Sequence, residues 1–96
     1  MQYVTSVRIA NKLDTELRFD LEPWGEQYQM PPGAVFTVVA RSPGPGHYEI
    51  QVAKGRITVF GWEGSTVELF RNGEVLGAHS GEPRPTPPPT PPRPRT

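Results

Sequence analysis

The chain has 96 residues, enough for one small domain, and its ten Lys/Arg and ten Asp/Glu give a formal net charge of 0. Residues 1–81 carry seven basic and nine acidic side chains, and this mildly acidic body argues against nucleic-acid binding, which needs a clustered basic surface. The sequence contains no cysteine, which excludes disulfides, thiolate nucleophiles and thiolate-held metals.

The first third of the chain is typical of β-strands separated by turns. Residues 3–10 alternate apolar and polar side chains, and so do residues 16–22, which predicts two half-buried strands. In the second strand we expect Leu17, Phe19 and Leu21 to face the core, and the charged residues, including Asp20, to face water. In the turn-rich connector at 11–15, an Asn or Asp side chain is expected to bond its own backbone.

The middle of the chain combines a long loop with a strongly apolar strand. Pro23 has no N–H for a strand ladder, so the second strand ends there, and residues 28–30 fit a short strand. The Pro32-Gly33 pair suits a type II turn. Residues 35–41 are apolar on both faces, which predicts a central strand or one covered on both sides.

Two hairpins are predicted towards the C-terminus. Residues 47–53 and 56–60 alternate around a Lys-Gly turn, with Tyr48, Ile50 and Val52 expected to face the core. Residues 66–71 and 74–76 flank an Asn-Gly pair, a strong hairpin signal. Six or seven strands without helical periodicity predict an all-β fold, a small antiparallel β-sandwich within residues 1–81.

Residues 82–96 have a different composition. They contain eight of the thirteen prolines, three arginines and no large apolar side chain, which predicts a disordered Pro/Arg-rich tail of extended polyproline II character. Pro88, Pro91 and Arg93 match the P-x-x-P-x-R spacing that docks in SH3-type grooves, and a simple spacer is the alternative interpretation.

The composition also bears on where the protein is found. Small secreted domains commonly carry disulfides, so the lack of cysteine favours the cytoplasm. No signal peptide and no apolar run long enough for a membrane-spanning helix can be identified, and we expect no membrane association.

Two Gly-rich loops, at residues 22–30 and 61–65, are the predicted contact surface. Aromatic faces beside carboxylates are typical of a protein-contact hot spot, and a carbohydrate platform has the same composition. In the competing interpretation, both tryptophans plug the ends of a thin core. The candidate binding residues are Glu22, Trp24, Glu26, Tyr28, Trp62 and Glu63.

The sequence favours a non-enzymatic binding or structural module. His47 and His79 lie in no nucleophile motif, no metal-ligand spacing occurs, and no cofactor site is expected. A small hydrolase, or a subunit of one, using Glu22 and Glu26 is one alternative, because paired carboxylates perform glycoside hydrolysis. An oligomeric structural protein that pairs through edge strands is another.

Several of these stretches together resemble a group of short, uncharacterised bacterial proteins without an assigned activity. That group shares an L-E-P-W-G stretch, present here at 21–25, a P-G turn at 32–33 and a G-W-x-G loop at 61–64. The resemblance covers roughly residues 4–76 and implies a β-sandwich. The order of strands, loop and P-G turn is also similar in pattern to β-sandwich binding domains such as the β domain of the von Hippel–Lindau protein.

Overall fold

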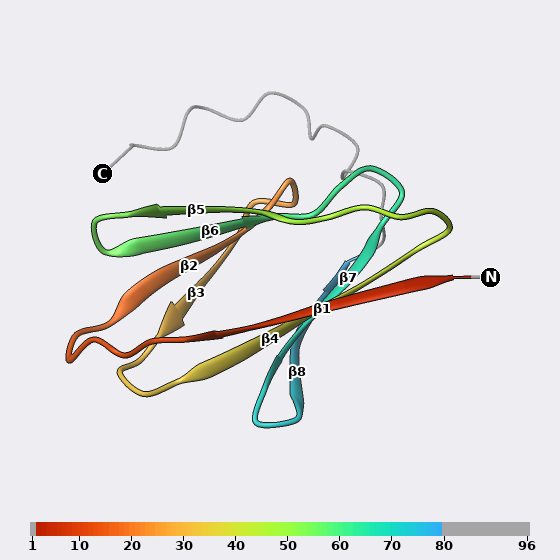
Figure 1. The fold of residues 1–96 in the computed structure, drawn as a ribbon. Coiled ribbons are helices and arrows are strands. Elements are labelled where there is room, and N and C mark those ends of the chain that lie inside the picture. Colours follow the sequence, from red (N-terminus) through yellow and green to blue (C-terminus); the bar gives the residue numbers. More distant parts are fainter. Residues whose placement is uncertain (1, 80–96) are drawn as a thin grey trace, which may run out of the picture.

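The computed structural model describes residues 2–79, which form two packed β-sheets (Figure 1). Among these residues there is no helix, and hence none long and apolar enough to cross a membrane. The Pro/Arg-rich segment 82–96, with Pro88, Pro91 and Arg93, lies outside the described residues. The strands are β1 (Tyr3–Ala10), β2 (Leu17–Glu22), β3 (Glu26–Met30), β4 (Val35–Ser42), β5 (Glu49–Ala53), β6 (Arg56–Phe60), β7 (Thr66–Arg71) and β8 (Glu74–His79).

Each sheet has four strands, in the orders β1-β4-β7-β8 and β3-β2-β6-β5. Neighbouring strands are antiparallel, except that β2 and β6 run parallel. The predicted all-β sandwich is confirmed, with eight strands in place of six or seven because residues 26–30 form a full strand against β2. The parallel pair could not be predicted, since apolar alternation looks the same beside either kind of neighbour.

The core lies between the two sheets and is built from alternate residues of their central strands. Leu17, Phe19 and Leu21 of β2 are buried, as predicted, and Phe36 and Val38 of β4 face them. The rings of Phe19 and Phe36 meet edge to face with centroids 5.0 Å apart. Burying each such side chain stabilises the fold by about 1.5–3 kcal/mol, so these facing rows hold the sheets together.

Asp20 departs from its predicted exposure to water. It is buried on the outer face of the second sheet, where its carboxylate accepts a hydrogen bond from Arg18 at 2.8 Å. Arg56, on the parallel neighbour β6, lies 3.9 Å from the other carboxylate oxygen. The two arginine side chains cover the aspartate, and their charges make its burial tolerable.

Asn11 fastens the connections at one end of the sandwich. Its side chain is fully buried and donates hydrogen bonds to the carbonyl oxygens of Thr15 and Met30, both at 2.9 Å. Its Oδ1 accepts from the N–H of Leu13, the local Asn turn that was predicted. Its backbone bonds Gly33 and Ala34, so one residue joins the ends of β1, β3 and β4.

The predicted tight turns are present, and the last strand is longer than expected. Asn72 (φ 52°) and Gly73 (φ 79°) both adopt the left-handed conformation that a two-residue hairpin turn requires. Strand β8 continues to residue 79 instead of ending at 76.

The prediction of which β5 side chains are buried was wrong. Ile50 and Val52 were expected in the core, but they are 42% and 76% exposed. Their alternation with Gln51 was read correctly as a strand pattern, because β5 pairs with β6 around the 54–55 turn. The strand is at the edge of its sheet, where the facing sheet does not cover it.

Candidate functional site

The turn between β2 and β3 is held by one of the candidate residues. Glu22 accepts a hydrogen bond on Oε1 from the Gly25 N–H at 2.9 Å. Gly25 has φ 73°, a left-handed conformation that residues with a Cβ rarely adopt. The Glu22 carboxylate therefore closes the turn, through a hydrogen bond that is exposed to solvent.

The loop between β6 and β7 lies directly beside this turn. The Gly61 N–H donates to the Glu22 carbonyl oxygen at 2.8 Å, which continues the parallel pairing of β2 and β6. A Cβ added at Gly61 would lie 2.8 Å from Cη2 of Trp24, so the indole ring packs on the glycine backbone. The two loops predicted to share a surface are thus brought together.

Trp24 belongs to the core. It is 5% exposed and joins the buried cluster that includes Leu21 and Val67. The interpretation of Trp24 as a core plug fits this position, whereas an open aromatic platform does not, because so little of its ring meets solvent.

Trp62 is half-buried and joins a third loop to the other two. Its indole packs against Gly46, where any Cβ would overlap the ring, and its ring lies 5.3 Å from that of Tyr48. Ser65 fixes the backbone around it: the Ser65 hydroxyl donates to the Trp62 carbonyl at 2.6 Å, and the Ser65 N–H bonds the same oxygen at 3.0 Å.

Tyr48 anchors this third loop to the opposite sheet. Its hydroxyl lies 2.7 Å from the Thr5 carbonyl oxygen and 3.2 Å from that of Val38, so it donates towards β1 and β4. Burial raises the pKa of Tyr48 to about 12, although a backbone hydrogen bond from Ala40 acts in the opposite direction. At neutral pH the phenol keeps its proton and remains a donor.

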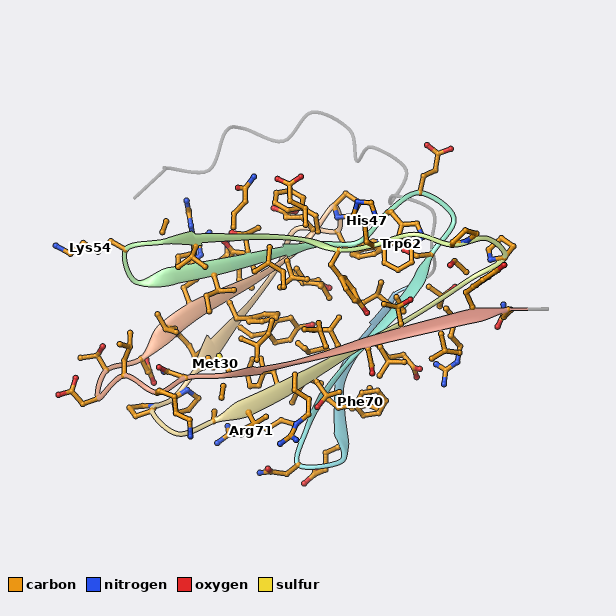
Figure 2. The ribbon with its side chains drawn as sticks, in the orientation of Figure 1. Met30, His47, Lys54, Trp62, Phe70 and Arg71 are labelled. Carbon is orange, nitrogen blue, oxygen red and sulfur yellow. The ribbon has the colours of Figure 1, made fainter. Side chains whose placement is uncertain are left out.

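Residues 23–25, 43–48 and 61–65 form what we call the loop end of the sandwich. Figure 2 shows His47 and Trp62 together there, with Lys54 at the far end of the β5–β6 hairpin. Sequence reasoning missed residues 43–48, because nothing local indicates that Gly46 receives a tryptophan sixteen positions later. The exposed residues of the loop end are Pro23, Gly25, Pro43, Pro45, His47, Glu63 and Gly64.

Glu26 and Tyr28 lie outside the loop end. Both belong to β3, where they pair with the buried residues Leu21 and Phe19 and so share the core face of the sheet. Each is half-buried. Burial, and secondarily the charge of Glu26, raises the pKa of Tyr28. The short strand expected at 28–30 is confirmed and begins already at Glu26, so these two candidate residues lie on a strand and not on the loop that was predicted for 22–30.

The loop end combines two exposed titratable side chains with proline and glycine backbone. Within residues 2–79, no group of three or more His, Asp or Glu side chains is placed to hold a metal ion. Glu63 and His47 are exposed on adjoining loops. The loop end presents a surface of proline, glycine backbone and a partly open indole, held by packed contacts between its loops.

Comparisons with protein families, with curated proteins and with solved structures gave no match for this chain. The resemblance to the short bacterial proteins therefore stays a prediction.

Proposed function

We propose that this chain is a non-enzymatic binding or structural module that contacts a partner protein through the loop end. The supporting observation is that three loops, distant in sequence, are fastened into one surface by Trp24 on Gly61 and Trp62 on Gly46. Rigid loops on a β-scaffold lose little conformational entropy on binding, so such a surface is suited to recognition.

A protein partner fits this surface better than a carbohydrate. A sugar platform needs an aromatic ring with one face open, and Trp24 is almost fully buried. The indole of Trp62 is in contact with Gly46 and with the ring of Tyr48, so part of its surface is covered. The loop end also exposes Pro43, Pro45 and Glu63, and together with the half-buried indole these residues give the mixed character of a protein-contact hot spot.

The hydrolase alternative has less support. Glu22 closes the 22–25 turn. Glu26 lies on the core face of β3, directly opposite Leu21 of β2. A pair that cleaves a glycosidic bond would have to flank a substrate cleft from both sides. The double variant Glu22→Gln/Glu26→Gln should leave partner binding within a few fold of wild type, whereas a hydrolase would lose its activity.

The proposed contact surface can be tested by charge reversal. Glu63→Lys places a new positive charge on the loop end, whereas Glu74→Lys makes the same exposed change beside the turn at the other end of β7. In affinity capture from the native lysate, we expect a partner retained by wild type and by Glu74→Lys to be lost by Glu63→Lys. A partner retained by Glu63→Lys and lost by Glu74→Lys would place the contact elsewhere and overturn the proposal.

A further inference from the structure

Strand β5 is an edge strand in which every residue is exposed. In the described part of the chain its only hydrogen-bonded neighbour is β6, and Figure 1 shows β5 on the side of β6 away from β2. Its five residues include no Pro, Gly, Lys or Arg, its one charged side chain is Glu49 at the first position, and no bulge interrupts its pairing with β6. Edge strands are normally protected by such features, because their outer N–H and C=O groups are open to another strand.

The other three edges carry protective features that β5 lacks. Strand β3 ends directly before two prolines, and its residues Tyr28 and Met30 are covered. The pairing of β8 with β7 shifts register between Leu69 and Phe70. Strand β1 carries Arg8 and is half-buried at alternate positions. Of the four edges, β5 is therefore the one most open to pairing.

The apolar face of β5 continues the core face of its sheet. Ile50 lies opposite Val59, which is fully buried, and Val52 lies opposite Ile57, which packs against the core. Residues directly opposite in an antiparallel pair point to the same face. Ile50 and Val52 therefore extend the core surface past the last covered strand, where 42% and 76% of their surfaces meet water.

We propose that β5 pairs antiparallel with β5 of a second copy of this chain, about a two-fold axis at Gln51. This is the symmetric register in which all five residues of the strand have a partner. Ile50 then lies opposite Val52 of the second copy, and the reverse holds by symmetry. The row of Ile57 and Val52 continues into Ile50 of the second copy, and the row of Val59 and Ile50 continues into its Val52. Both apolar side chains thereby lose part of their contact with water.

The charges near the strand favour the same arrangement. In the antiparallel register Glu49 lies opposite Ala53 of the second copy, next to its Lys54, and this attraction occurs twice. A parallel, in-register pair would instead place the two Glu49 carboxylates side by side. The segment after residue 79 is a poor occupant by comparison, because its many prolines have no N–H to donate to a strand edge.

A single engineered cysteine tests both the dimer and its register. The chain has no native cysteine, so Gln51→Cys creates one thiol per copy. Directly opposite Cα atoms in an antiparallel pair are about 4.5–5.5 Å apart, within the range that a disulfide spans. Under mild oxidation of the full chain, we expect Gln51→Cys to become a disulfide-linked dimer. Glu49→Cys is the control, because its two thiols would lie about 13 Å apart and should not cross-link.

A second pair of variants tests the apolar contact. Val52→Lys, made in the Gln51→Cys background, buries an ammonium against Ile50 of the second copy and should abolish the cross-link. Val4→Lys is a matched control, since Val4 is a 61% exposed valine on the edge strand of the other sheet. Both positions are exposed, so neither variant should unfold the chain, and circular dichroism checks this.

Three outcomes would overturn the proposal. In the first, the Gln51→Cys protein stays monomeric under oxidation at high concentration. The strand that pairs with β5 would then have to come from a different protein. Another is equal cross-linking of Glu49→Cys, which would indicate random collision. The third is a cross-link that survives Val52→Lys. None of these results depends on the loop end, so the dimer and the proposed function are tested separately.

Discussion

The indole of Trp62 meets the phenol ring of Tyr48 edge to face, with centroids 5.3 Å apart and ring planes at 78°. This contact joins the loop after β6 to the loop before β5. The Tyr48 hydroxyl then reaches the carbonyl oxygens of Thr5 and Val38 on the other sheet. One aromatic pair thus connects two loops and both sheets, and several expectations follow from its surroundings.

Gly46→Ala should destabilise the protein by about 1–3 kcal/mol, because the new methyl group would overlap the Trp62 indole and force it to move. Gly44→Ala is the control: it lies in the same loop, and a Cβ there meets nothing within 4 Å. Urea denaturation of both variants provides the comparison. Equal stability of the two would show that the indole does not depend on Gly46.

The two tryptophans should differ in fluorescence. Trp62→Phe leaves only the 5% exposed Trp24, whose emission should be blue-shifted and protected from iodide. Trp24→Phe leaves the half-buried Trp62, whose emission should be quenched in part. Stern–Volmer slopes measure the difference. A Trp62→Phe protein that iodide quenches as readily as free tryptophan would place Trp24 at the surface.

Stability should fall at alkaline pH because of Tyr48. Its pKa in the fold is about 12, above the ordinary value of 10.0, so the folded state holds the proton more tightly than the unfolded state. That contribution is fully present below pH 10 and is lost as the pH rises to about 12. Since the side chain is only partly buried, we expect a loss of about 1 kcal/mol.

The variant Tyr48→Phe distinguishes the alkaline loss of stability caused by Tyr48 from that caused by Tyr28, whose pKa is also raised. The variant should be less stable than wild type by about 1 kcal/mol at pH 7, because the hydrogen bond to Thr5 is gone. It should also show a smaller decrease between pH 10 and pH 12. Denaturant midpoints across that range provide the measurement, and identical alkaline slopes for the two proteins would contradict the assignment to Tyr48.

Asn11→Ala should cost about 2–3 kcal/mol, since it removes the buried hydrogen bond to the Met30 carbonyl oxygen and the turn at Leu13. Lys12→Ala, at the exposed neighbouring position, should stay within about 0.5 kcal/mol of wild type. Thermal unfolding followed by circular dichroism compares the two. Equal losses of stability for the two variants would show that the Asn11 side chain does not hold the ends of β1, β3 and β4 together.

The parts of the fold that are local in sequence were predictable. The alternation of Leu17, Phe19 and Leu21 identifies a strand and its buried face, and the Asn-Gly pair at 72–73 identifies a hairpin. Both patterns act through the few residues that carry them, so no knowledge of the rest of the chain is needed.

The remaining features depend on contacts between distant strands. Asp20 has a local partner in Arg18, but its second arginine, Arg56, arrives only through the parallel pairing of β2 with β6. Exposure of Val52 depends on where the facing sheet stops, and alternation alone does not reveal this. The residues around Trp24 have the same composition whether it plugs a core or displays a face. For the candidate site, the sequence indicated two of the three loops, and the tertiary packing supplied the third.

The parallel pair β2–β6 has a consequence for how the chain reaches its fold. In this pair, residues far apart in sequence lie side by side, for example Arg18 and Arg56. In the hairpins β2–β3, β5–β6 and β7–β8, by contrast, the paired residues are close in sequence. Loop-closure entropy makes such distant pairings slow, so we expect the hairpins to form early and the docking of β6 on β2 to limit the folding rate. During synthesis, the loop end can assemble only after most of the chain has left the ribosome.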